Sequence, residues 1–168
     1  IEQSGRGFSF QKKEPLLMTF NAHPDEKSLT AYEILNQWNK TQIETILKNY
    51  GEERFSRQIA KAIIEARNIK TIGYSDELAE IVIRTIPRRF QKKSIHPATK
   101  TFQALRIAVN DELNALTEGL HKALECLNAG GRIGVISFHS LEDRIVKHFF
   151  KAHEKSGKLF IITKKPII

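Results

Sequence analysis

The sequence predicts an α/β protein that carries an all-helical subdomain. Residues 29–95 have helical periodicity without a strand candidate, and the last third of the chain alternates helix, strand, helix and strand. With 168 residues, 40% of them hydrophobic, the chain is long enough for one domain with a small appendage. We therefore expect a connector over residues 1–28, a helical subdomain over residues 29–95, and an α/β region over residues 96–168.

Glycines and prolines interrupt residues 1–28, which show little periodicity and are typical of an extended connector. The chain opens on Ile1 in a polar, glycine-containing run and ends just after a strand-like run, and neither end has the sequence of a natural terminus. We therefore expect the chain to be part of a larger protein.

Four helices are expected in residues 29–95, because apolar residues recur there at helical spacing. The second is expected to begin at Thr41, because Thr41 and Glu44 have the spacing of a capping box, and to end at Gly51. The fourth is expected to be capped by Ser75 and ended by Pro87. The pattern places the four helices at residues 29–38, 41–51, 55–66 and 75–87.

Residues 97–128 continue the helical pattern over a length at which we expect a bend, and Gly130 and Gly131 end it. Residues 132–138 form a short apolar run rich in β-branched residues, which is typical of a strand buried on both faces. Residues 140–153 return to a helical period, and residues 158–163 form a last strand. This order of elements predicts the α/β class.

A positive net charge favours an anionic partner. Lys and Arg number 27 against 19 Asp and Glu, which gives a formal charge of +8 and favours nucleic acid. The stretch from Arg84 to Lys100 holds six Lys and Arg residues and no acidic residue, so it is suited to phosphate contacts. A solvated loop is the alternative. Phe90 and Phe102 are candidates for stacking on bases, although Phe102 better fits a core position.

Other classes of site are disfavoured. Cys126 is the single cysteine, so it forms no internal disulfide, and its apolar helical neighbours predict a buried, inert thiol. One cysteine suits a reducing compartment, and no signal peptide or apolar run of about 20 residues is present, so we expect a cytoplasmic protein without a membrane span. The His residues lack metal-ligand spacing, so no metal is expected. Glycine-rich cofactor motifs are absent from this chain.

A polar cluster follows the first predicted strand: Ser137, His139, Ser140 and Asp143. In open α/β sheets, ligands bind beyond the carboxyl ends of the strands, where helix N-termini offer free N–H groups. The alternative is structural, because Ser140 and Asp143 resemble a capping-box pair and Arg144 could simply pair with a carboxylate. A Ser-His-Asp hydrolase is disfavoured, because adjacent residues on one turn do not align as a triad and no G-x-S-x-G motif is present.

Four segments occur in an order that resembles one known family, and the last two are long and specific. They are Arg6–Phe10 (RGFSF), Tyr50–Arg54 (YGEER), His96–Leu113 (HPATKTFQALRIAVNDEL) and Gly130–Lys147 (GGRIGVISFHSLEDRIVK). Together they resemble the MraW/RsmH family, S-adenosylmethionine-dependent methyltransferases that form N4-methylcytidine in small-subunit ribosomal RNA.

The resemblance implies a Rossmann-like methyltransferase domain with an all-helical insertion, residues 96–168 being the C-terminal part of that domain. It also implies that the cofactor-binding loop lies upstream of Ile1, so no cofactor-binding residue is expected in this chain, which should be inactive alone. One departure is that Leu17 and Thr19 stand where the family often has Asp and Arg. That change puts a polar role for residues 15–20 in doubt and favours packing.

The resemblance also implies site residues and partners. Ser137, His139, Ser140 and Asp143 are expected to line the catalytic pocket. The expected partner is small-subunit ribosomal RNA or the assembled small subunit, and a homodimer is left open. The residues expected to contact RNA are Arg6, Arg88, Arg89, Lys92, Lys93, Lys100, Arg106 and Arg144.

Two other functions remain open. One is a non-catalytic RNA-binding or ribosome-assembly module, and the other is a small-molecule methyltransferase that shares only the fold. The basic stretch discriminates between them, since a small-molecule enzyme has no need of it. Phosphate contacts release counterions, so RNA affinity that does not depend on salt would exclude both RNA functions.

Overall fold

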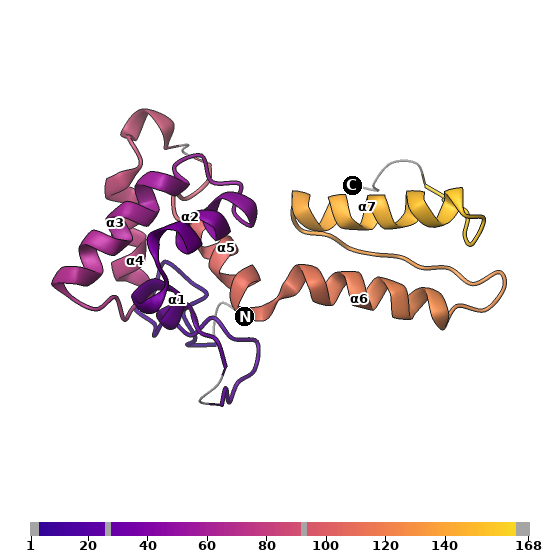
Figure 1. Cartoon of the computed structure of the whole chain (residues 1–168), viewed down its shortest axis with the longest axis horizontal. Coiled ribbons are helices and arrows are strands. Elements are labelled where there is room, and N and C mark those ends of the chain that lie inside the picture. The colour runs from indigo at the N-terminus through magenta and orange to yellow at the C-terminus, as the bar shows by residue number, and fades with distance from the viewer. Residues whose placement is uncertain (1–3, 26–27, 92–93, 164–168) are drawn as a thin grey trace. The chain divides into compact units, whose positions relative to one another are not determined.

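The computed structural model describes residues 4–25, 28–91 and 94–163. The chain divides into two compact units, Ile1–Asn110 and Asp111–Ile168 (Figure 1). These units do not test the domain organisation expected for the intact protein, which stays a prediction. The described helices are α1 (Ala31–Gln37), α2 (Lys40–Asn49), α3 (Ser56–Ile69), α4 (Ser75–Thr85), the 3₁₀ helix η1 (Arg88–Phe90), α5 (Thr99–Asn110), α6 (Glu112–Glu125) and α7 (Ser140–Lys155).

The four predicted helices of the first unit are present as α1–α4, but the start of α2 was predicted two residues late. Helix α1 follows Thr30, whose Oγ1 accepts a hydrogen bond from the Glu33 N–H at 3.2 Å. Helix α2 follows Asn39, whose Oδ1 accepts a hydrogen bond from the Gln42 N–H at 2.9 Å. Thr41 is therefore inside the helix, because the amide side chain two residues earlier already caps it.

The predicted cap of α4 is also wrong by one residue. Tyr74 is the N-cap, and Ser75 is the first helical residue. The Ser75 hydroxyl accepts a hydrogen bond from the Glu14 N–H at 3.1 Å and donates one to the Lys12 carbonyl. Ser75 therefore serves to join the connector to the helix, because its side chain is directed at residues 12–14 and not at its own helix.

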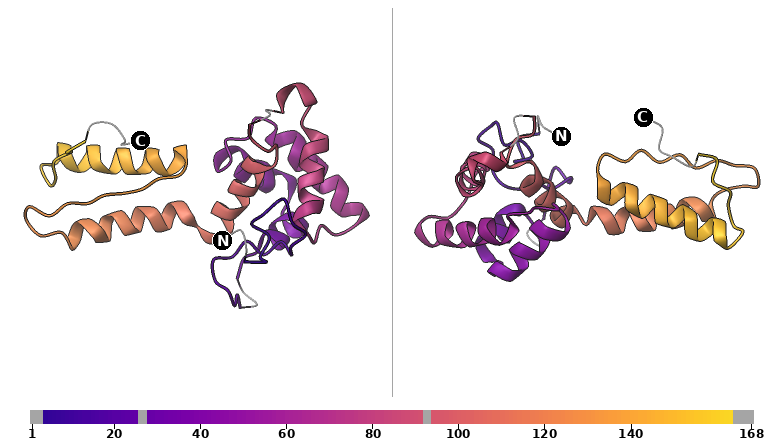
Figure 2. Two further views of the ribbon diagram at one scale, coloured as in Figure 1. Left: turned by 180° about the vertical axis from the view of Figure 1, so that it is seen from behind. Right: turned by 90° about the horizontal axis from the view of Figure 1, so that it is seen from above.

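Helices α1–α5 enclose the hydrophobic core of the first unit (Figures 1 and 2). Helix α5 packs on α1 and α2, and α3 packs on α2 and α4. The fully buried large side chains of these helices are Ile34, Leu35, Ile43, Leu47, Ile59, Ile63, Leu78, Val82, Leu105 and Ile107. Phe102 is 5% exposed, which confirms its core position. Across the described segments, none of the helices combines the length and apolarity that crossing a membrane requires.

The connector belongs to the same core. Leu16 and Met18 are 1% and 0% exposed. The Leu16 N–H donates to the Gly73 carbonyl at 3.1 Å, and the Leu17 carbonyl accepts from the Ala31 N–H at 3.0 Å at the start of α1. Residues 15–18 are thus held through their backbone and through the buried side chains of Leu16 and Met18.

The bend predicted in residues 97–128 is a break between α5 and α6. It falls at Asp111, which has a left-handed φ of 49°. In the second unit, α6 and α7 lie side by side and run in the same direction (Figures 1 and 2). The chain returns between them through an extended segment, residues 131–138.

The two predicted strands are not paired into a sheet among the described residues, so the α/β class is not confirmed. Residues 132–137 and 159–161 have no assigned secondary structure except for bends. Ile136, Phe138 and Phe160 are 84%, 88% and 84% exposed. A strand requires hydrogen bonds to a neighbour, and no neighbouring strand is described.

The prediction of a buried thiol at Cys126 is wrong, because this residue is exposed. Cys126 follows the last residue of α6, a helix on which Leu120 is the one buried residue described. The other leucines of the α6 stripe, Leu113, Leu116 and Leu124, are half-buried, so the apolar helical pattern alone did not establish full burial.

Candidate functional site

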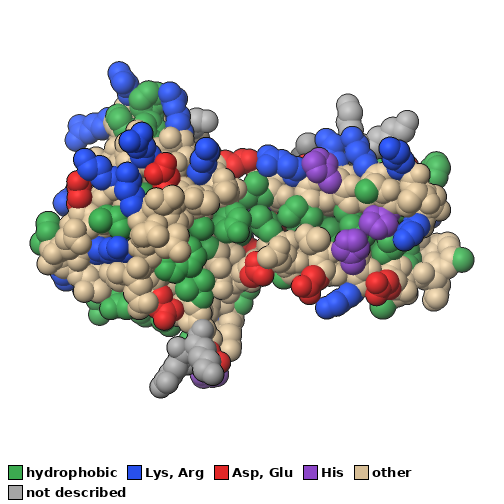
Figure 3. Space-filling view, in the orientation of Figure 1, with side chains coloured by type: hydrophobic (Ala, Val, Ile, Leu, Met, Phe, Trp, Pro, Cys, Tyr) green, Lys and Arg blue, Asp and Glu red, His purple; other side chains and the backbone are tan. Residues whose placement is uncertain are grey.

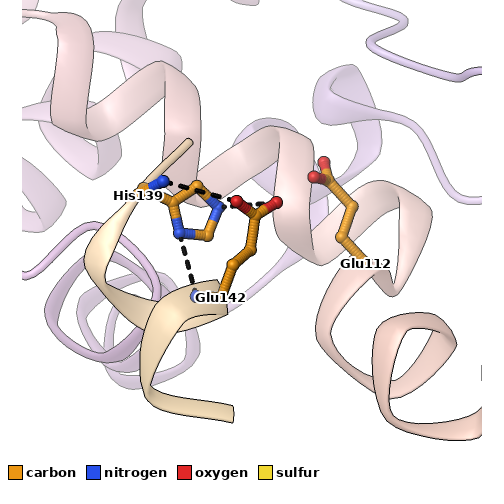
Figure 4. Close-up of side chains that lie close together, drawn as sticks. All are labelled: Glu112, His139 and Glu142. Carbon is orange, nitrogen blue, oxygen red and sulfur yellow. Dashed lines mark hydrogen bonds and ion pairs between the residues drawn. The ribbon is translucent and has the colours of Figure 1, made fainter. Parts of the chain in front are cut away.

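The predicted site at the start of α7 is organised by a reciprocal capping box between His139 and Glu142 (Figure 4). The His139 Nδ1 accepts a hydrogen bond from the Glu142 N–H at 3.3 Å. The Glu142 Oε2 accepts hydrogen bonds from the N–H groups of Phe138 at 2.7 Å and His139 at 3.3 Å. The predicted Ser140–Asp143 pair is therefore wrong by one position, since Ser140 is the first helical residue and its neighbour is the N-cap.

This cap indicates which tautomer the neutral His139 ring adopts. Because Nδ1 accepts a backbone hydrogen bond, the proton of the neutral ring is on Nε2. That nitrogen lies 3.4 Å from the Glu142 Oε1, and it is buried without a hydrogen-bond partner of suitable geometry among the described residues. The Nε2–H is therefore an unsatisfied donor that faces the Glu142 carboxylate in a buried position.

Glu112 of α6 lies next to this pair (Figure 4). One potential metal-ligand atom of each of Glu112, His139 and Glu142 lies within 4.8 Å of the others. A metal would require an unprotonated Nε2, and the proton would then move to Nδ1 and break the cap. The geometry therefore favours a capping box over a metal centre at this position.

The other three predicted pocket residues flank the cap along the chain. Ser137 is exposed in the extended segment, Ser140 is exposed in the first turn of α7, and Asp143 is half-buried in the same turn. Glu142 was missed as a site residue. The signal that could have found it is the capping-box spacing from His139, three residues earlier.

A second candidate site is the basic edge of the first unit. Arg88 and Arg89 are exposed in η1, and Figure 3 shows Lys and Arg side chains around hydrophobic ones at this end of the unit. Lys100 is exposed at the start of α5, and its Nζ donates to the Glu52 carbonyl at 2.8 Å. Arg84 pairs with Glu80 at 2.8 Å, so its charge is partly compensated. Lys92 and Lys93 lie outside the described residues.

Three predicted RNA contacts lie elsewhere in the chain. Arg6 donates from Nη1 to the Phe20 carbonyl at 2.7 Å and lies over the Phe8 ring at 5.6 Å, so it serves to fasten the connector. Arg106 is half-buried on α5, and Arg144 is exposed on α7. Among the described residues of the first unit, Arg88 and Arg89 lie together in η1, whereas Arg6 lies in the connector and Arg106 lies on α5.

His96 does not add charge to the basic edge at neutral pH. Its ring stacks on Phe10 with a centroid separation of 4.1 Å and an interplanar angle of 8°. Its Nδ1 accepts a hydrogen bond from the Ala98 N–H at 3.2 Å. Burial lowers the pKa of His96 below its ordinary value of 6.5, because the charged form loses hydration. His96 therefore acts as a packing residue at the start of α5.

The chain is similar to a set of named proteins over almost its full length. Residues 1–168 match the model of the MraW methylase family. A "Ribosomal RNA small subunit methyltransferase H" of Persephonella marina is 49% identical over 96% of this chain and 54% of its own length. Proteins with the same name from Synechocystis sp. and Leptospira interrogans are each 48% identical, over 100% and 98% of this chain and 52% and 48% of their own. The chain thus spans about half the length of the curated relatives it matches.

Proposed function

Because the chain belongs to the MraW methylase family, we propose that the intact protein transfers a methyl group from S-adenosylmethionine to the exocyclic N4 of a cytidine in small-subunit ribosomal RNA. The observation that carries this proposal is the match across almost the whole chain to relatives named as small-subunit ribosomal RNA methyltransferases. The N4 position follows from the resemblance of the sequence motifs.

The second unit supports the proposal of a Rossmann-like domain in the intact protein. Two helices that run in the same direction, joined by an extended return, make the α–β–α connection from which α/β domains are built (Figure 1). Ile136 and Phe138 at the end of the extended segment are exposed, as apolar residues of a strand would be without its neighbours. We assign the neighbouring strands to the half of the family's length that this chain does not match.

The chemistry requires positioning more than acid–base strength. The N4 lone pair of cytosine is delocalised into the ring, so the site must align N4 with the methyl group and accept hydrogen bonds from the amino group. The base must also leave its stack. Ser137, Ser140 and Asp143 offer oxygen acceptors at the start of α7, and the His139 Nε2–H offers a donor.

No residue of this chain is assigned to the cofactor. S-adenosylmethionine supplies a methyl group activated by its sulfonium, and holding it usually requires a glycine-rich loop after a strand, which this sequence lacks. We accordingly propose that the 168-residue chain is inactive alone, and that methyl transfer needs the intact protein. The partner is ribosomal RNA or the assembled small subunit, and a homodimer and a cytoplasmic location stay predictions.

The decisive experiment separates a capping role of His139 from a role in the pocket. The intact protein and its variants His139→Ala and His139→Asn are assayed for methyl transfer to small ribosomal subunits. Asparagine keeps an acceptor for the helix N–H but removes the imidazole. If the imidazole donates to the substrate, both variants lose activity by about tenfold or more.

If His139 only caps α7, the asparagine variant keeps its activity while the alanine variant is less stable by about 1 kcal/mol. If the intact protein transfers no methyl group but binds RNA in a salt-dependent way, the proposed enzyme activity is wrong and the non-catalytic RNA-binding module is favoured. Methyl transfer to a small molecule without RNA binding would favour the third function.

A further inference from the structure

Phe90 is an exposed aromatic residue, and the guanidinium groups of two arginines lie over its ring. It lies in η1, and its side chain is 38% exposed. The Arg54 guanidinium lies 4.8 Å from the Phe90 ring centroid, and the Arg89 guanidinium lies 4.9 Å from it. The Phe55 ring packs against the Phe90 ring, with a centroid separation of 5.3 Å. Residues distant in the sequence thus converge on one ring.

The structure holds this ring in place. The Gln91 side chain donates from Nε2 to the carbonyls of Ile83 at 2.9 Å and Ile86 at 2.8 Å, which fastens the end of η1 to the end of α4. On the other side, the buried Glu53 accepts a hydrogen bond from the Phe55 N–H at 2.9 Å. Two separate anchors therefore hold the segments that carry Phe90 and Phe55, which reduces the entropy lost when a ligand binds there.

The two cations over the ring have no anionic partner among the described residues. Neither Arg54 nor Arg89 takes part in an ion pair within the portions of the chain that the structure describes. The positive charges of Arg54 and Arg89 repel each other, so a bound anion would reduce this repulsion. A cationic, planar, partly exposed surface is what an unpaired nucleotide requires, because its base has a π-face and its phosphate is negative.

We propose that Phe90, Arg54 and Arg89 form a stacking site for one unpaired base of the RNA substrate. The base stacks on the Phe90 ring in place of one guanidinium, and that guanidinium then pairs with the adjacent phosphate. This inference rests on the proposed function for its RNA partner and adds a contact that recognises single-stranded RNA. Phe90 and the arginines are binding residues that lie away from the reacting atoms.

The test measures the affinity of the intact protein for two short probes of equal length: a single-stranded RNA, and an abasic oligonucleotide with the same number of phosphates. The variant Phe90→Leu keeps apolar packing against Phe55 but loses the π-face. We expect it to bind the base-bearing RNA about tenfold more weakly, because base stacking of this kind contributes at that level. Its affinity for the abasic probe and its salt dependence should stay unchanged, because the phosphate contacts remain.

Two further variants keep the test independent of folding. Arg54→Lys retains the charge but not the planar guanidinium, so it should lower the affinity for the base-bearing probe but not for the abasic probe. Tyr32→Leu is the matched control, because Tyr32 is 40% exposed on α1 and has no described cation over its ring. It should change neither affinity. Thermal unfolding of each variant verifies that the fold is kept.

The outcomes separate this inference from the proposed function. If the wild type and Phe90→Leu bound the base-bearing RNA equally well, the stacking site would be overturned. The surface would then be a candidate for binding a protein partner. Methyl transfer could still be measured, so the proposed function would not be affected. If Phe90→Leu weakened the binding of both probes equally, the stacking site would also be overturned. The effect of the substitution would then not depend on the base, and the ring would serve only the structure of the protein. A wild type that binds neither probe would overturn the stacking site, whereas the methyl-transfer assay on small ribosomal subunits tests the proposed function separately.

Discussion

Asn110 joins the end of α5 to the connector, and replacing it should destabilise the first unit strongly. Its Oδ1 accepts a hydrogen bond from the Phe20 N–H at 2.7 Å, and its Nδ2 donates to the Met18 carbonyl at 2.7 Å. Nδ2 also donates to the Arg106 carbonyl at 2.9 Å within the helix. Met18 has a left-handed φ of 56°, a conformation that costs free energy in a residue other than glycine. The Asn110 side chain therefore supports a segment that is not at its own conformational minimum.

The magnitude for Asn110→Ala follows from the two bonds that cross between segments. Each hydrogen bond contributes about 1 kcal/mol, and a partly buried group left without a partner costs about 1 kcal/mol more. We expect the free energy of unfolding to fall by about 2–3 kcal/mol, which corresponds to a decrease in Tm of about 10 °C for a unit of this size. Asn110→Asp should be at least as destabilising near neutral pH, because its carboxylate faces the Met18 carbonyl where Nδ2 had donated.

Trp38 is the single tryptophan of the chain and packs against the core of the first unit, so its fluorescence reports the unfolding of this unit in urea. Asn49→Ala is the matched control, because Asn49 is exposed at the end of α2 and should change stability by less than about 0.5 kcal/mol. An Asn110→Ala midpoint equal to that of Asn49→Ala would refute the reasoning. A fully stable Asn110→Asp would show that the Nδ2 donor bonds contribute nothing.

Two further predictions concern helix contacts and pH. At Gly51 an added Cβ would lie 2.6 Å from the Lys100 carbonyl oxygen and 2.8 Å from that of Leu47. Gly51→Ala should therefore lower the free energy of unfolding in urea by about 3 kcal/mol. An unchanged midpoint would show that α2 and α5 separate freely. The Lys70 side chain hydrogen-bonds to Glu77 and lowers the pKa of that carboxyl below 4.5, while burial opposes this shift. The resulting stability is present above the ordinary pKa and is lost as the pH falls through the folded pKa. Glu77→Gln should therefore be less stable than the wild type by up to about 1 kcal/mol at neutral pH and equal to it in acid, and a difference that persists in acid would contradict the assignment.

Helix positions could be predicted from the sequence, but helix caps could not be placed to the residue. In residues 29–85, apolar spacing was sufficient because the buried stripes of α1–α4 face one core. At the caps, several polar residues stand in a row and more than one has suitable spacing. Asn39 and not Thr41 caps α2, and His139 and not Ser140 caps α7, because the cap is the residue whose backbone is still extended before the helix begins.

The candidate site could be predicted only where its residues are neighbours in the sequence. His139 was identified from a local motif, but the role of Glu142 depends on which residue is the N-cap, and Arg54 reaches Phe90 only through the packing of α3 against the end of α4. Asn110 likewise fastens residues 18–20 across most of the first unit. Contacts between distant segments follow from the tertiary structure, and a single sequence carries no direct signal for them.

The apolar pattern of the segment before α7 bears on the surroundings of these residues as well as on their backbone conformation. Ile133 and Val135 are half-buried, whereas Ile136 and Phe138 are 84% and 88% exposed. Apolar residues on both faces of an extended run are typical of a strand inside a sheet that is covered on both sides. Large side chains this exposed are unfavourable in water and mark surfaces that another element covers. The strand over residues 132–138 stays a prediction, and the exposure of Ile136 and Phe138 is the observation that favours a covering layer there.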